Sequence, residues 1–246
     1  MTQASPGLAV VLVGGLGTRV RHLLGGRPKP LAPVAGRPFL EWVLRYLDGQ
    51  GIGRVILAAG YAAPQIEAFA ASRDLPGMDI HVVTETEPRG TGGAFLHAWS
   101  ASGREEPNVL VLNGDSLALA SLAPLYEALD TGAGALLAVD VADVSRYGSV
   151  AVDAQGRLAG FAEKRAGGGR GLVNAGVYLF SRSAVQIFPD QGVLSFETDV
   201  FPALLSSDAP IQVVSTSCPF LDIGTEASMA EAAGFINNNG RWFVPA

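Results

Sequence analysis

Three glycines follow an apolar stretch near the N-terminus and are themselves followed by basic residues. The segment reads LAVVLVGGLGTRVRHLLGGRPKP, with Gly14, Gly15 and Gly17 directly after the aliphatic run and Arg19 and Lys29 further on. A glycine turn after a strand presents backbone N–H groups to phosphate oxygens, and guanidinium and ammonium groups balance the phosphate charge. Prolines on both sides of Lys29 stiffen the loop that carries its amine. The spacing therefore predicts a phosphate-binding pocket.

Two other glycine-rich phosphate motifs do not fit this segment. A Walker loop ends in Gly-Lys-Ser/Thr, whereas Gly17 is followed by Thr18 and Arg19. The dinucleotide fingerprint G-x-G-x-x-G requires a third glycine where this chain has Val20, and no acidic residue about twenty positions later is placed for a ribose. Hydride transfer with a dinucleotide cofactor is therefore disfavoured.

The composition narrows the class of protein. The chain has 246 residues, of which 48% are hydrophobic, and a net charge of −6. This length is typical of one α/β domain, so we expect a single domain over residues 1–246. An acidic chain lacks the positive field that nucleic acids require, so we expect no nucleic-acid partner. Cys218 is the only cysteine, and there is no signal segment or long apolar span, which predicts a cytoplasmic protein without a membrane partner.

Short aliphatic runs alternate with amphipathic segments through the first part of the chain. The predicted strands are Leu8–Val13, Arg54–Ala58, Ile80–Val83, Val109–Leu112, Ala135–Val139 and Val173–Phe180. The predicted helices are Pro38–Gln50, Pro64–Ser72 and Gly93–Ser102. Such alternation predicts an α/β fold, a Rossmann-like three-layer sandwich with a mostly parallel mixed sheet between two layers of helices.

The pattern changes after about residue 140. Tyr147–Val152 and Leu158–Glu163 are typical of strands joined by a turn, and a glycine-rich loop, AGGGRG, follows at 166–171. Antiparallel elements are expected in this part. We therefore expect a nucleotide-binding half over about residues 1–140 and a half that faces the other substrate over about 141–246.

Further short motifs follow one another in order along the chain. GGLGTR at 14–19 and PKP at 28–30 are followed by EPRGTGGA at 87–94, NGD at 113–115, YG at 147–148, EK at 163–164, NAG at 174–176 and LDIGT at 221–225. This series resembles the signature of sugar-1-phosphate nucleotidyltransferases, also called NDP-sugar pyrophosphorylases. The resemblance implies a glycosyltransferase-A-like fold and an in-line attack of a sugar 1-phosphate on the α-phosphorus of a nucleoside triphosphate. Because the nucleophile is already an anion, positioning and charge neutralisation suffice, and no general base is required.

The resemblance also implies roles for individual residues. Arg19 would hold the departing pyrophosphate and Lys29 would neutralise the α-phosphate, while Asp115 and Asp222 would hold Mg²⁺ through carboxylate oxygens. An aspartate after a strand, taken alone, is as often a cap or turn residue. The expected catalytic residues are Arg19, Lys29 and Asp115. The expected nucleotide-binding residues are Gly14, Gly15, Gly17, Thr18, Arg19, Lys29, Glu85, Gly90, Thr91 and Gly114. The expected sugar-phosphate-binding residues are Gly148, Glu163, Lys164 and Asn174.

The base preference depends on Glu85. In relatives that use thymidine or uridine nucleotides, the position five before the loop glycine is commonly glutamine, and here Gly90 places Glu85 there. A carboxylate only accepts hydrogen bonds, so it suits guanine, whose N1–H and exocyclic amine are adjacent donors. We therefore expect GTP. The alternative is that Glu85 points to solvent and that base specificity lies elsewhere.

The sugar is indicated by a closer resemblance. The stretches KPLAPV at 29–34 and GRPFLE at 36–41, together with the short length, resemble compact bacterial guanylyltransferases of D-glycero-α-D-manno-heptose 1-phosphate. Mannose 1-phosphate is the near neighbour, because an apolar contact to one extra group discriminates by only about 1–3 kcal/mol. Cytidylyl or uridylyl transfer to another hexose 1-phosphate and a non-catalytic nucleotide-sugar-binding subunit are further alternatives. Val13 departs from the family, in which alanine is usual.

The sequence also predicts where some residues outside these motifs lie. Arg21 and Arg27 are interpreted as surface or auxiliary cations, and His81 falls on a predicted core strand. Trp242 and Phe243 near the C-terminus indicate either a homodimer interface or aromatic rings that fold back on the core.

Overall fold

The structure is a computed structural model and describes residues 7–73, 75, 77–145, 148–162 and 168–244. Within these residues nine strands form one sheet. They are β1 (Ala9–Leu12), β4 (Arg54–Ala59), β5 (Asp79–Thr84), β6 (Asn108–Asn113), β8 (Gly134–Val141), β9 (Ser149–Val152), β10 (Leu158–Ala162), β11 (Gly171–Ser181) and β12 (Ile211–Thr216). The strand order is β10-β9-β11-β6-β1-β4-β5, with β8 beside β11 and β12 beside β8.

The centre of the sheet is parallel. β1 pairs in parallel with β4 and with β6, and β4 pairs in parallel with β5. β11 runs antiparallel to β6 and to β8, while β12 is parallel to β8. The aliphatic runs of the central strands suit burial on both faces of a parallel sheet. The prediction of a mixed, mostly parallel sheet is confirmed.

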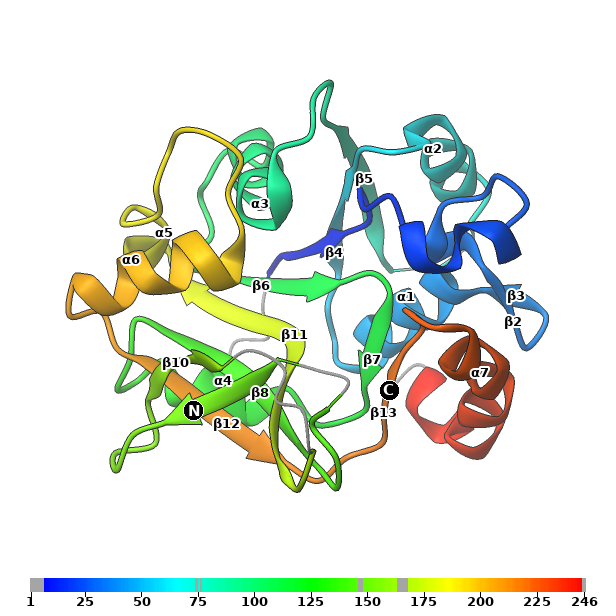
Figure 1. Ribbon diagram of the computed structural model, residues 1–246. Coiled ribbons are helices and arrows are strands. Elements are labelled where there is room, and N and C mark those ends of the chain that lie inside the picture. Colours follow the sequence, from blue (N-terminus) through cyan, green and yellow to red (C-terminus); the bar gives the residue numbers. More distant parts are fainter. Residues whose placement is uncertain (1–6, 74, 76, 146–147, 163–167, 245–246) are drawn as a thin grey trace.

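Helices cover both faces of this sheet (Figure 1). One face packs against α1 (Phe39–Gly49), α2 (Ala63–Ala71), α4 (Ala123–Ala128) and α7 (Glu226–Asn238). The other face packs against α3 (Gly90–Ala101), α5 (Arg182–Val185), the π-helix η3 (Phe196–Val200) and α6 (Phe201–Ser206). Successive residues of β1 alternate between the two cores, with Val11 in the first and Val10 in the second. The predicted three layers are therefore present.

Short elements complete the chain. They are the 3₁₀ turns η1 (Thr18–Leu23), η2 (Lys29–Leu31) and η4 (Gly240–Phe243), the hairpin β2 (Pro33–Val34) and β3 (Arg37–Pro38), and the pair β7 (Ser116–Ala118) and β13 (Phe220–Asp222). Figure 1 shows α7 beside the β2–β3 hairpin and the red η4 turn next to it. Among the described residues, none of the helices has the length and apolarity that a membrane span requires.

Two predicted features differ in the structure. α3 begins at Gly90 and not at Gly93, because the N–H groups of its first turn find partners outside the helix: Gly92 N donates to Leu194 O at 2.8 Å. His81 is not in the core, since its side chain is 64% exposed on the edge strand β5 and lies 3.0 Å from Asp79. The predicted strand ends at Tyr147 and Glu163 lie outside the described residues.

The C-terminal aromatic residues fold back on the core. Phe243 is 4% exposed, and its ring centroid lies 5.2 Å from that of Trp42 on α1. Trp242 packs against Tyr46 on the same helix, with centroids 6.2 Å apart. The interpretation in which these rings fold back on the core therefore agrees with the structure.

Phe95 on α3 tests the packing of the second core. Its side chain is fully buried among the rings of Trp99, Phe180, Phe188 and Phe196. Phe95→Ala should lower the free energy of unfolding by about 3–5 kcal/mol, because it removes apolar contacts and leaves a cavity. Urea unfolding followed by circular dichroism measures this. Val193→Ala is the control, since that side chain is 70% exposed. If both variants lost the same free energy of unfolding, the assignment of Phe95 to the core would be contradicted.

Candidate active site

The carboxyl ends of β6, β1, β4 and β5 meet along one edge of the sheet, as parallel pairing requires. A cavity of about 630 Å³ opens at this edge. Each of the four strands contributes lining residues just after it ends, and these are Asp115, Gly14, Gly60, Tyr61 and Glu85. Segments separated by up to a hundred residues in the chain are thus brought together by the fold itself.

The predicted glycine loop forms one wall of the cavity. Gly14, Gly15, Gly17, Thr18 and Arg19 all line it. Gly17 has φ +57°, and a Cβ there would lie 3.0 Å from Lys29 Cβ, so both the backbone conformation and the close approach require glycine. A Cβ at Gly15 would meet nothing within 4 Å, so the loop backbone is open there.

Lys29 is the charged centre of the site. The residue is only 8% exposed, and its Nζ lies 2.5 Å from Asp115 Oδ2 and 4.0 Å from Asp222 Oδ1. An unpaired ammonium at this depth would cost several kcal/mol, so the two carboxylates offset the cost of burying it. The 3₁₀ turn η2, with Pro30 at its start, fixes the backbone of Lys29. Pro28 precedes this turn and Pro30 lies within it.

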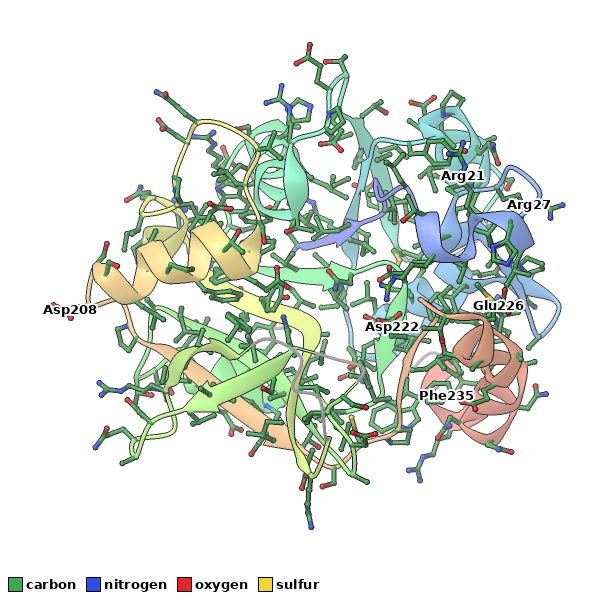
Figure 2. All side chains as sticks on the ribbon, viewed as in Figure 1. Arg21, Arg27, Asp208, Asp222, Glu226 and Phe235 are labelled. Carbon is green, nitrogen blue, oxygen red and sulfur yellow. The ribbon has the colours of Figure 1, made fainter. Side chains whose placement is uncertain are left out.

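Asp222 reaches the site through a second, small sheet. β13 pairs antiparallel with β7 and places Asp222 opposite Ser116, while Ile223 N donates to Asp115 O at 3.1 Å. Figure 2 shows Asp222 where the segment before α7 passes β7. Burial, and then the nearby Asp115 carboxylate, raise the pKa of Asp222; Lys29, the Gly224 backbone N–H at 2.6 Å and Arg19 oppose this.

The two carboxylates are a donor set for a hard divalent cation. Asp115 and Asp222 approach the same ammonium group, and the negative charge of Asp115 contributes to the raised pKa of Asp222. Within the described residues, no group of three or more His, Cys, Asp or Glu side chains could hold a metal ion. A cation here would therefore share these two carboxylates with oxygen atoms from a ligand or from water, as small hard cations do.

Glu85 lines the cavity, and its side chain is partly buried. Its Oε1 fills the space of the missing side chains of Gly60 and Gly14, because a Cβ at these glycines would lie 2.6 and 3.0 Å from it. Its Oε2 is buried, with no hydrogen-bond partner among the described residues. Burial raises the pKa of Glu85, against the smaller effect of the Arg89 backbone N–H. The site thus holds a half-buried carboxylate with an acceptor to spare.

The first turn of α3 closes another side of the cavity. Gly90 and Thr91 line it, but the Thr91 hydroxyl is already engaged, since it accepts from Phe196 N at 3.1 Å. Gly90 has φ +72°, and a Cβ there would lie 2.8 Å from the carbonyl carbon of Leu194. The conformation at the start of α3 therefore depends on contacts with the segment around Leu194 as well as on its own glycines.

The other expected residues lie elsewhere. Gly114 does not line the cavity; a Cβ there would lie 2.6 Å from Val13 Cγ1, so glycine allows the residue after β6 to lie close to the residue after β1. Asn174 is outside the cavity lining and donates to Tyr178 Oη at 2.8 Å and to Glu197 Oε1 at 3.3 Å. Gly148 is exposed, and the expected pair 163–164 lies outside the described residues.

Sequence reasoning missed Gly60 and Tyr61, which line the cavity. A sequence signal was available, because both come shortly after the predicted strand Arg54–Ala58, and ligands bind beyond the carboxyl ends of parallel strands. Asn113 also lines the cavity and was noticed only as part of a motif. Glu197, beside Asn174, has no sequence signal of its own.

Comparison with known proteins agrees with this geometry. Residues 8–239 match the family described as "Nucleotidyl transferase". The chain belongs to this family. The family resemblance and the fold predicted from the motifs are thereby confirmed.

Two curated relatives of this nucleotidyl transferase are informative. The chain is 37% identical to D-glycero-alpha-D-manno-heptose 1-phosphate guanylyltransferase of Aneurinibacillus thermoaerophilus, over 78% of this chain and 82% of the relative. It is also 37% identical to mannose-1-phosphate guanylyltransferase of Mycobacterium tuberculosis, over 88% of this chain but only 61% of that relative's length. Among solved structures, HddC from Yersinia pseudotuberculosis complexed with GMP-PN superposes with a TM-score of 0.82 at 30% identity, covering 92% of this chain and 98% of HddC.

Gly60 tests whether Glu85 contacts a nucleotide. Gly60 does not have a positive φ, so Gly60→Ala is compatible with its backbone conformation. A Cβ there would lie 3.2 Å from Gly14 O but only 2.6 Å from Glu85 Oε1, so the carboxylate is the group that must move. Calorimetric titration with GTP should show a loss of affinity of about tenfold or more, as expected when one charge-assisted hydrogen bond is lost. Circular dichroism should show an unchanged fold.

Gly234→Ala on α7 is the matched control, because a Cβ there meets nothing within 4 Å. It should bind GTP like the wild type and gain about 0.5–1 kcal/mol of stability, since glycine is unfavourable within a helix. An unchanged GTP affinity in Gly60→Ala would contradict a contact between Glu85 and the nucleotide.

Proposed function

We propose that this protein transfers a guanylyl group from GTP to a sugar 1-phosphate and that D-glycero-α-D-manno-heptose 1-phosphate is the sugar substrate. The observation that carries the proposal is the buried Lys29 ammonium between Asp115 and Asp222 at the edge of a cavity that Glu85 also lines. The two guanylyltransferases named above support the base and the class of sugar, since each is 37% identical to this chain. The structural similarity to HddC, whose structure was solved with GMP-PN, also supports a guanine nucleotide as the ligand.

The chemistry matches these charges. An oxygen of the sugar 1-phosphate forms a bond to the α-phosphorus of GTP as the bond to pyrophosphate breaks, and the electron pair leaves with pyrophosphate. Lys29 neutralises the α-phosphate while charge develops there, and Arg19 holds the departing pyrophosphate. Because the attacking oxygen is already an anion, no side chain has to remove a proton from it.

A divalent cation completes the charge balance. Asp115 and Asp222 would hold Mg²⁺, whose preferred ligands are carboxylate and phosphate oxygens. When bound, the ion supplies further neutralisation of the phosphate groups. The two carboxylates bracket Lys29, so the protein itself places its ammonium group next to the oxygen donors of the cation.

Glu85 would read the base. Its buried Oε2 lacks a partner among the described residues, and its Oε1 lies against Gly60. Two carboxylate oxygens match the adjacent N1–H and exocyclic amine donors of guanine, whereas uracil and thymine present acceptors beside their single imide N–H. The buried acceptor therefore favours GTP.

The sugar phosphate would bind in the half formed by about residues 141–246, with the nucleotide in the half formed by about 1–140. Gly148 and Asn174 are the proposed sugar-site residues among those the structure describes, together with Glu163 and Lys164 outside them. Mannose 1-phosphate is a second candidate substrate, because the mannose-1-phosphate guanylyltransferase of Mycobacterium tuberculosis is as similar as the heptose enzyme. The cytoplasmic location and the homodimer stay predictions.

A substrate panel tests this function. Pyrophosphate release is measured with Mg²⁺ for GTP, ATP, CTP, UTP and dTTP, each against heptose 1-phosphate and mannose 1-phosphate, and we expect turnover with GTP. Lys29→Met should lower kcat by a factor of about 10²–10³, corresponding to the loss of one preorganised donor. Arg27→Ala should not, because Arg27 is exposed and outside the cavity lining. Turnover confined to CTP or UTP would contradict the role of Glu85, and no turnover with any pair would favour a non-catalytic binding subunit.

Glu85→Gln tests the base assignment. ITP lacks the exocyclic amine of guanine, so the wild type should prefer GTP to ITP by about tenfold or more in kcat/KM, and Glu85→Gln should lose most of that preference. Burial raises the pKa of Glu85, so acidification should erode the preference at a higher pH than for an ordinary glutamate. Glu105→Gln, at an exposed position, is the control. A pH-independent preference that survives in Glu85→Gln would rule out this role.

A further inference from the structure

Tyr61 is the only aromatic residue among the described residues that line the cavity. It follows β4, which lies between β1 and β5 in the sheet. Its position is therefore between the glycine loop after β1 and Glu85 after β5. Tyr61 N donates to Gly14 O at 3.2 Å, which fixes the backbone of the turn to the glycine loop.

Arg21 lies against this ring. Its guanidinium carbon is 5.2 Å from the centre of the Tyr61 ring, and its Nη2 donates to Tyr61 Oη at 3.3 Å. Arg21 belongs to η1, two residues after Arg19, so the contact joins the glycine loop to the turn after β4. A second contact joins the same segments, since Gln65 Nε2 on α2 donates to Gly26 O at 3.1 Å.

Arg21 thus differs from its neighbour Arg27. Both belong to the segment between β1 and β2, but Figure 2 shows Arg27 extending away from the body of the protein and Arg21 near α2. Both side chains are exposed, as expected of surface or auxiliary cations. Arg21 makes a cation–π contact, which tends to fix the orientation of the ring.

We propose that Tyr61, held by Arg21, is a stacking wall for the purine ring of the nucleotide. The proposal rests on the proposed function, in which Glu85 binds the edge of the base. A base whose edge meets Glu85 lies over the end of β4, because Gly60 packs directly against that carboxylate. The face of the base then needs an apolar or aromatic surface, and Tyr61 is the ring available there.

The role of Tyr61 would differ in kind from that of Glu85. Stacking acts on the face of the base and is tolerant of base identity, whereas hydrogen bonding at the edge discriminates among bases. Loss of the ring should therefore weaken all nucleotides alike. Loss of the carboxylate should change the ratio of their affinities. A purely structural Tyr61, which only anchors the turn before α2, would affect stability and leave nucleotide affinity in the folded protein unchanged.

Equilibrium binding of GTP and of ITP, measured by calorimetry without sugar phosphate, separates these roles. Tyr61→Leu should weaken both nucleotides by about tenfold with an unchanged GTP to ITP ratio, because it removes base–aromatic stacking. Tyr61→Phe keeps the ring and should bind within about threefold of the wild type, because it removes only the long, solvent-exposed hydrogen bond from Arg21. Arg21→Ala should give a loss between these two, and Arg27→Ala should give none.

The outcomes are distinct. Wild-type affinity for GTP in a folded Tyr61→Leu, or a change in the GTP to ITP ratio like that of Glu85→Gln, would overturn the stacking wall. Where Tyr61→Leu does not fold, a loss in Tyr61→Phe as large as tenfold would also overturn it, because the hydroxyl and not the ring would then be responsible. Binding of CTP or UTP in place of both purine nucleotides, weakened in Tyr61→Leu, would support the wall and contradict the proposed base.

Discussion

Parallel pairing of β6, β1, β4 and β5 places four strand ends side by side, and every feature of the candidate site depends on that arrangement. Each strand ends in residues that a binding site can use: Asp115, the glycine loop, Tyr61 and Glu85. Their mutual positions follow from the strand order and register, since a shift of one residue would turn each side chain to the other face. The cores on both faces hold that register, because β1 contributes Val10 to one and Val11 to the other.

The charged side chains at this edge of the sheet determine which ligands it can bind. Lys29 is buried only because Asp115 and Asp222 offset its charge, and these three residues come from distant parts of the chain. The β7–β13 pairing supplies Asp222, and the bond from Ile223 N to Asp115 O locks it to the end of β6. The ammonium is therefore held in place before any ligand arrives, which is the condition under which a charge stabilises a transition state at little reorganisation cost.

Much of this site could be predicted from short segments of the sequence. The part that could not be predicted depends on contacts between segments that are distant in the chain. The glycine loop and Lys29 were predicted because glycines, cations and prolines act on their own backbone, and the sheet class followed from the alternation of strands and helices. The strand order could not be obtained this way. His81 was therefore wrongly expected in the core, since β5 is an edge strand. Tyr61 follows a predicted strand, but its place between the glycine loop and Glu85 comes from the strand order. The engagement of the Thr91 hydroxyl by Phe196 N also required tertiary structure.

The contacts around Leu194 show why the two proposed halves are not independent. The first turn of α3 lines the cavity, yet its Gly92 N–H donates to Leu194 O, and Leu194 N donates to Arg89 O, each at 2.8 Å. A fragment ending near residue 140 would leave these groups without partners and would lack β11, which pairs with β6. The same segment continues to Glu197, which accepts from the Asn174 side chain at 3.3 Å. The stretch from Leu194 to Glu197 thus contacts both the first turn of α3 and Asn174, a proposed sugar-site residue.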